Sequence, residues 1–278
     1  MSAEGIALPR EPRLLGLRRG TWPRILAPLL MGLVALGAWE FAVRHFEVPP
    51  YILPGPVAIG QTLAENWTSL LGSLAVTLRI TLLALLLAVV TGVALAMLFS
   101  ASRWVEMTFL PYAVMLQVTP VVSIAPLIII WVDNVQAALL VCAWIVAFFP
   151  IVSNTTIGLN STDRNLLDLY RLLGASRWQT LVGLRLPAAL PFFLAGLRIS
   201  GGLSLIGAIV AEFVAGTGGN SSGLAYRILE AGYQLQIPRM FAALALISLS
   251  GVAIFLVLSL LSHLLLRRWH ESALGGER

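Results

Sequence analysis

The sequence predicts an all-α polytopic membrane protein with six transmembrane helices, and three observations support this fold class. Of the 278 residues, 58% are hydrophobic and only 11% are charged, whereas soluble domains carry roughly 25% charged residues. Six apolar stretches are long enough to cross a bilayer, whose core of about 30 Å requires roughly 20 helical residues. The arginines are concentrated in alternate connections between these stretches. A soluble globule of this composition would expose an aggregation-prone apolar surface, so soluble enzymes are excluded.

The predicted spans follow one another closely and fill most of the chain. They comprise residues 25–43, 74–99, 107–132, 135–158, 190–213 and 240–266. Together they predict one transmembrane domain over residues 25–268, with tails at 1–24 and 269–278. The third span contains Pro111, Pro120 and Pro126, which indicate either a broken helix or ordinary kinks.

The distribution of arginines predicts the orientation in the membrane. With a cytoplasmic N-terminus, the inner connections hold most of the arginines, and the outer connections hold only Arg44, Arg227 and Arg239. This bias satisfies the positive-inside rule with both termini in the cytoplasm, and it requires an even number of spans. No small-residue cleavage pattern follows the first apolar run, so we expect that run to be retained as a span.

Two outer segments are expected to hold short helices. In residues 54–69, Ile59, Leu63 and Trp67 recur at helical spacing, which predicts an amphipathic helix at the membrane interface. Residues 214–238 begin with a glycine-rich run at 216–223 and continue into a second short helix. There, Arg227 and Glu230 have the spacing of an ion pair.

The longest inner connection, residues 159–189, predicts two short amphipathic helices joined at a glycine. Gly174 is suited to the left-handed position that ends the first helix. Ser176 and Gln179 have capping-box spacing at the start of the second helix, and Pro187 is expected to end it. The apolar stripe of these helices either packs on the protein's own spans or docks a soluble partner.

This connection resembles the cytoplasmic "EAA" loop of permease subunits of bacterial ABC importers. That loop reads Glu-Ala-Ala, three residues, Gly, nine residues and Ile-x-Leu-Pro, which Asp168, Gly174, Leu184 and Leu186-Pro187 match in spacing. Flanking runs at 174–178, 186–191, 196–199 and 205–213 resemble the nitrate, sulfonate, taurine and bicarbonate branch, and the likeness covers about residues 50–268. The chain departs from the pattern at Leu169-Tyr170, Gln117 and Val121.

The resemblance implies the type I ABC importer permease fold and the role of a non-catalytic transport subunit in a bacterial inner membrane. It implies a homodimer with two cytoplasmic ATP-binding subunits, an external solute-binding protein and membrane lipid as partners, and no nucleic acid. The solute would be a nitrate-, sulfonate-, taurine- or bicarbonate-like anion, or a pyrimidine or vitamin precursor. The residues expected to couple to the ATPase are Asp168, Gly174, Ala175, Ser176, Arg177, Leu186 and Pro187.

The composition of the chain also indicates that ATP is hydrolysed by another protein, because all 18 residues of the Lys and Arg type are arginine and none is lysine. A nucleotide-binding P-loop requires a lysine, so ATP with its magnesium would bind to a partner chain, and no cofactor is expected here. The glycine-rich run at 216–223 is expected to be a hinge or gate loop.

Polar residues within the spans are costly and are therefore candidates for the pathway or gate. The candidates are Arg79, Gln117, Ser123, Ser200, Ser204 and Glu212. For Glu212 the alternatives are an outer gate, a support for the glycine-rich loop, or a solvated interfacial carboxylate. For Arg79 they are an anionic solute, a lipid phosphate or a structural ion pair.

Other functions fit the sequence less well. An intramembrane serine protease would need a histidine near Ser204 at mid-membrane, but His45, His263 and His270 lie at or beyond span ends. The sequence has no His, Cys or carboxylate cluster with metal-ligand spacing. An ion-coupled secondary carrier or channel remains the alternative, and it would transport without an ATPase.

Overall fold

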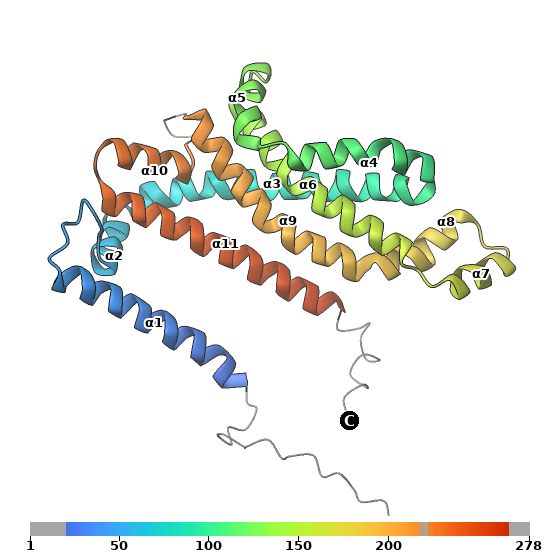
Figure 1. Ribbon diagram of the computed structural model, residues 1–278, viewed down its shortest axis with the longest axis horizontal. Helices are drawn as coiled ribbons and strands as arrows, with labels where there is room; N and C mark the ends of the chain where they lie inside the picture. The colour runs from blue at the N-terminus through green and yellow to red at the C-terminus, as the bar shows by residue number, and fades with distance from the viewer. Residues whose placement is uncertain (1–20, 217, 219–221, 267–278) are drawn as a thin grey trace, which may run out of the picture.

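The computed structural model of the chain describes residues 21–216, 218 and 222–266, and every regular element in these ranges is helical (Figure 1). The helices are α1 (Thr21–His45), α2 (Pro56–Glu65), α3 (Trp67–Ala101), α4 (Arg103–Val118), α5 (Val121–Trp131), α6 (Val135–Asn160), α7 (Arg164–Leu172), α8 (Arg177–Thr180), the π-helical turn η1 (Leu181–Arg185), α9 (Leu186–Ala215), α10 (Leu224–Tyr233) and α11 (Ile237–Leu266). Of the predicted tails, residues 1–20 and 269–278 lie outside the described residues.

The six predicted spans correspond to five long apolar helices and one bent pair. Within the described residues, α1, α3, α6, α9 and α11 are each long and apolar enough to cross a membrane, and the number is six when the bent pair of α4 and α5 is counted as one span. Several helices extend beyond the predicted limits. The second span begins at Trp67, so this residue starts α3 and does not continue the outer helix α2.

The third span is broken. The axes of α4 and α5 differ by 101°, and Thr119 and Pro120 separate the two helices. Pro120 has no N–H to donate, and its ring disfavours a helical backbone at the preceding residue. Thr119 accordingly has a ψ of 122°. Pro111 and Pro126 lie inside α4 and α5 without ending them.

The core forms where α6 packs between α3 and α9, and small residues allow this close approach. A side chain on Gly196 of α9 would lie 2.7 Å from the carbonyl oxygen of Pro150 on α6. One on Gly207 would lie 2.8 Å from the Cα of Ala143. The glycine-rich fifth span therefore packs within the subunit, because its glycines let the two backbones meet.

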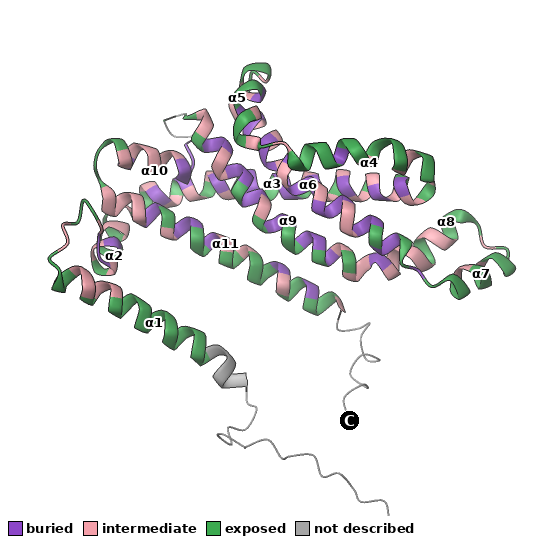
Figure 2. Cartoon of the chain, viewed as in Figure 1, coloured by how far each residue is buried: buried purple, intermediate pink, exposed green. Residues whose placement is uncertain are grey.

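The first span, α1, stands apart from this core (Figure 2). None of its described side chains is buried, and it reaches the bundle through its outer end. There, the Trp39 ring lies 6.2 Å from the ring of Phe241, and Glu40 accepts a hydrogen bond from the Val57 N–H of α2 at 3.1 Å. The remaining surface of α1 is apolar and suits contact with lipid or another chain.

The short helices lie at opposite ends of the bundle. Figure 1 places α2 and α10 at one end and α7 and α8 at the other. The segments predicted to face opposite sides of the membrane are thus separated by the length of the spans.

Candidate functional site

The connection between α6 and α9 turns at Gly174, and we call α7, Gly174 and α8 together the corner. Gly174 has a φ of +69°, a left-handed conformation that costs other residues energy. The Gly174 N–H donates to the Arg171 carbonyl, and the Ala175 N–H donates to the Tyr170 carbonyl, both at 3.0 Å. These two bonds form a Schellman motif, which satisfies carbonyls at the end of α7. The predicted role of Gly174 as a helix end is confirmed.

Side-chain caps define the start of each helix in this connection. Asp163 caps α7, accepting a hydrogen bond from the Asn165 N–H at 2.8 Å. At α8, the Gln179 N–H donates to Ser176 Oγ at 3.2 Å, and the Ser176 N–H donates to Gln179 Oε1 at 2.7 Å. The predicted capping box is therefore present, with both halves formed.

The prediction that Pro187 ends the second helix is wrong. Pro187 lies in the first turn of α9, where its missing N–H is tolerated. Helical backbone continues without a break from Arg177 to Ala215. The π-helical turn η1, in which the Leu186 N–H donates to the Leu181 carbonyl, carries the backbone past the proline ring. The corner is thus an extension of the fifth span.

Arg185 ties this extension to the inner end of α3. Its Nη1 donates to Ser100 Oγ at 2.8 Å and to the Ser100 carbonyl at 3.2 Å. A displacement of η1 would therefore act on the second span as well as the fifth.

The apolar side chains of the corner remain exposed. Leu172 is 85% exposed and Trp178 is 69% exposed, with Leu166, Leu169 and Leu173 also exposed. Asp168 forms an exposed ion pair with Arg171 at 2.9 Å. Within the single chain, these side chains do not pack on the spans, which leaves an apolar face open at the end of the bundle that holds α7 and α8.

At the end of the bundle that holds α2 and α10, Glu212 of α9 caps the first turn of α10. Its side chain is buried and accepts hydrogen bonds from Thr77 Oγ1 of α3 at 2.8 Å and from the Ala225 N–H at 3.1 Å. The Leu224 N–H donates to Thr77 Oγ1 at 2.9 Å. Gly223, the N-cap residue of α10, has no side chain to supply this cap. A Cβ at Gly223 would overlap the Glu212 carboxylate.

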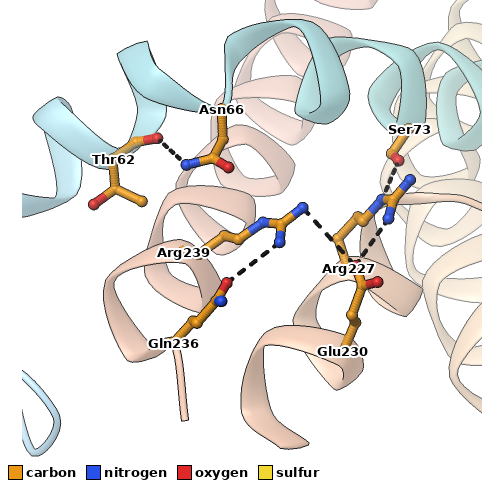
Figure 3. A network of polar contacts seen from close by, with 7 residues as sticks. All are labelled: Thr62, Asn66, Ser73, Arg227, Glu230, Gln236 and Arg239. Atoms are coloured by element: carbon orange, nitrogen blue, oxygen red, sulfur yellow. Dashed lines mark hydrogen bonds and ion pairs between the residues drawn. The ribbon is translucent and has the colours of Figure 1, made fainter. Parts of the chain in front are cut away.

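A second polar network holds the other end of α10 (Figure 3). Arg227 donates to Ser73 of α3 at 3.0 Å and to Glu230 at 2.8 Å. Arg239 at the start of α11 lies 3.9 Å from Glu230 and donates to Gln236 at 3.3 Å. The predicted Arg227–Glu230 pair is present, and it is shared by three helices.

A cavity of about 360 Å³ lies beside the break between α4 and α5. Gln117 and Thr119 line it from the broken span, Val146 and Pro150 from α6, and Leu203 and neighbouring residues from α9. Of the candidate pathway residues, Gln117 alone lines this cavity.

The other candidate pathway residues lie elsewhere. Ser123 and Arg79 are exposed on α5 and α3, and neither side chain forms a hydrogen bond or ion pair with the described residues. Ser200 is buried and donates to the Ala147 carbonyl of α6 at 2.6 Å, which joins two helices. Ser204 donates to the Gly201 carbonyl of its own helix at 3.0 Å. The candidates thus form no single cluster.

Comparison with known proteins decides the family. Residues 80–271 match the family described as "Binding-protein-dependent transport system inner membrane component". The chain belongs to this family of permeases. It is a multi-pass inner-membrane transport subunit with no catalytic role, and its family implies association with ATPase and substrate-binding protein partners.

The permease is similar over nearly its whole length to relatives, two of which are named for different solutes. It is 35% identical to a probable ABC transporter permease of Haemophilus influenzae, with 86% of this chain and 96% of the relative covered. It is 34% identical to the formylaminopyrimidine transport permease ThiX of Halalkalibacterium halodurans, with 87% of this chain and 95% of the relative covered. It is 31% identical to the putative aliphatic sulfonates transport permease SsuC of Bacillus subtilis, with 94% of this chain and 92% of the relative covered.

A solved structure supports the fold of the permease. A chain from the crystal structure of an amino acid ABC transporter with histidines superposes with a TM-score of 0.60 at 18% identity, covering 75% of this chain and 97% of that chain. The predicted all-α permease fold is confirmed.

The sequence did not indicate that Thr77 helps to cap α10 or that Arg185 contacts α3. Thr77 carries a weak signal, since Ser73 and Thr81 lie one helical turn away on each side and make a buried polar stripe in an apolar helix. For Arg185 no local pattern identifies Ser100, which lies 85 residues earlier, as its partner.

Proposed function

We propose that this permease forms the translocation pathway of an ATP-driven solute importer and receives the energy for transport through residues 159–189. In this proposal it works as a homodimer in the lipid bilayer, with two cytoplasmic ATPase subunits that bind ATP and magnesium and an external solute-binding protein. Both termini are cytoplasmic. The solute is small, either an anion such as a nitrate, sulfonate, taurine or bicarbonate, or an uncharged pyrimidine or vitamin precursor.

The observation that carries the proposal is the exposed apolar corner at the inner end of a continuous helix. Leu172 and Trp178 would bury their side chains on a partner, and full burial of one such side chain contributes roughly 1.5–3 kcal/mol. Because α8, η1 and α9 form one helical path, a push on the corner is transmitted to the fifth span. The Arg185–Ser100 bonds carry the same motion to the second span.

Two features of the corner suit a lever. The Schellman motif at Gly174 and the capping box at Ser176 leave few backbone groups free to rearrange. The coupling residues Asp168, Ala175 and Arg177 lie on or beside this corner, whereas Leu186 and Pro187 lie at the junction with α9. Because the corner is rigid and lies at the end of a long helix, closure of the ATPase pair would tilt the spans.

The proposal is tested by reconstitution. The permease is copurified with candidate ATPase and binding-protein partners from the same organism, and ATP-dependent solute uptake is measured in vesicles. Uptake that requires ATP and all three components is expected. ATP-independent uptake by the permease alone, driven by an ion gradient, would instead identify a secondary carrier.

A further inference from the structure

The cavity at the broken span has the position of a solute site. It lies between the broken span and the packed pair of α6 and α9, beside the middle of α6, where Val146, Pro150 and Leu203 line it. Non-helical backbone in a membrane is tolerated where protein or a water-filled cavity surrounds it. Broken helices at mid-membrane form the solute sites of other transporter folds. Its volume, about 360 Å³, is within the range of small-molecule sites.

Its lining carries no formal charge. No Asp, Glu, Arg or His is among the described residues that surround the cavity, and the polar side chains are those of Gln117 and Thr119. Arg79 is on α3, which does not reach the cavity, and Arg198 of α9 lies over the Phe255 ring, 5.9 Å from its centre. The cavity is open in the single chain, and Gln117 itself is exposed. An anion seated on this lining would lose part of its hydration without gaining a counter-charge, which is unfavourable.

The backbone at the break between α4 and α5 does not supply the positive charge that a cationic side chain would provide. The C-terminus of α4 and the N-terminus of α5 both end at the cavity, at Val118 and Val121. The first end carries partial negative charge and the second partial positive charge, so their effects on a nearby ion oppose each other. The pair of ends provides carbonyl acceptors and N–H donors together, which suits a solute that both donates and accepts hydrogen bonds.

The two polar side chains together also provide a donor and acceptors. The Gln117 amide donates and accepts. Thr119 gives its hydroxyl proton to the Met115 carbonyl at 2.6 Å, which leaves its lone pairs available as acceptors. The aliphatic side chains of Leu116, Val121 and Ile206 cover the rest of the cavity.

We infer that this cavity selects an uncharged solute with an apolar body and an amide-like hydrogen-bonding edge, such as a pyrimidine or flavin ring, and that Gln117 is the specificity-determining residue. This inference rests on the proposed function. The proposed function leaves two solute classes open, and the cavity favours the uncharged class. The Gln117 amide pairs with the ring edge, and the aliphatic lining covers the ring faces.

The test measures ATP-dependent uptake in vesicles that contain the permease, its ATPase and a saturating amount of its binding protein. The labelled probes are formylaminopyrimidine and riboflavin as uncharged solutes, and nitrate and an alkanesulfonate as anions. Uptake of an uncharged probe is expected. Gln117→Leu should lower this uptake about tenfold, since a lost hydrogen bond of about 1.4 kcal/mol corresponds to that factor. Gln117→Arg should lower it further.

A matched variant separates the cavity from the binding protein, which also selects the solute. Gln136→Arg adds the same charge in the first turn of α6, at an exposed position outside the cavity, and should leave uptake at the wild-type rate. Uptake of an anion by the wild-type complex, or equal effects of Gln117→Arg and Gln136→Arg, would overturn the inference alone. The absence of ATP-dependent uptake for every probe would overturn the proposed function as well.

Discussion

Glu212 and Thr77 lie on different spans and jointly supply the N-terminal cap of a third helix. Thr77 Oγ1 donates to Glu212 Oε1 at 2.8 Å, and the two side chains accept the N–H groups of Ala225 and Leu224. Capping oxygens are ordinarily supplied by the residue that precedes a helix, but here that residue is Gly223. The outer helix α10 is therefore positioned by the second and fifth spans, and a relative movement of those spans would move it.

Replacement of the capping carboxylate should destabilise the outer end of the permease. Glu212→Ala leaves the Ala225 N–H buried without its acceptor, at a cost of about 1–3 kcal/mol. The Thr77 hydroxyl loses its bond to the carboxylate and keeps the Ser73 carbonyl, at 3.3 Å, as an acceptor. Glu212→Gln keeps one acceptor oxygen and should have a smaller effect. The measurement is thermal unfolding in detergent, followed by proteolysis within residues 216–223. Equal unfolding temperatures for Glu212→Ala and wild type would contradict the cap.

The two glycines of the α10 segment should respond differently to alanine. Gly223→Ala places a methyl group against the Glu212 carboxylate, so the cap must open. A side chain at Gly232 meets nothing within 4 Å, and alanine there favours the helix by up to about 1 kcal/mol. We expect a lower unfolding temperature and reduced uptake for Gly223→Ala only. A wild-type profile for Gly223→Ala, or matching losses in both variants, would refute this arrangement.

Gly174→Val should leave the permease inserted in the membrane but uncouple transport from ATP hydrolysis. The left-handed conformation at Gly174 costs a residue with a Cβ roughly 1–2 kcal/mol, so valine should reshape the corner. Gly174→Asn is the control, because asparagine tolerates this conformation better than other residues. The readout is solute uptake per ATP hydrolysed in reconstituted vesicles. Retained uptake by the valine variant would disprove the role assigned to the corner.

A charge on the exposed apolar face should prevent docking of the ATPase. Leu172→Glu places a carboxylate where Leu172 is 85% exposed in the single chain, and its burial in a partner groove would cost several kcal/mol. Arg164→Gln makes the same change in net charge at an exposed position on the side of α7 away from the centre of the apolar face and serves as the control. We expect copurification of the ATPase to fall at least tenfold for Leu172→Glu and to persist for Arg164→Gln. Copurification that survives Leu172→Glu would place the docking surface elsewhere.

Local patterns predicted most of the inner corner. Gly174 and the Ser176–Gln179 capping box depend on backbone groups within a few residues, so their spacing in the chain is sufficient to identify them. Pro187 was misinterpreted for a related reason. A proline signals the end of a helix or the first turn of one, and only the path of the backbone through η1 distinguishes the two cases.

The polar candidates within the spans were predicted less well, because residue type does not show which way a side chain faces. Ser200 and Gln117 are both polar residues in apolar helices. The structure places Ser200 against the Ala147 carbonyl and Gln117 at the cavity beside the break. That difference depends on how α6, α9 and the broken span are rotated against one another.

The sequence by itself determined the membrane class, the positions of the spans and the turn at Gly174, whereas the structure decided that the third span is broken and not merely kinked. The first three follow from hydropathy and from short-range chemistry, both of which act along the chain. The tertiary structure alone decided that Glu212 caps α10 through Thr77, that Arg185 holds Ser100, and that a cavity without charged side chains lies beside Gln117. These relationships join residues far apart in the chain, and only the packing of helices brings their side chains within contact distance.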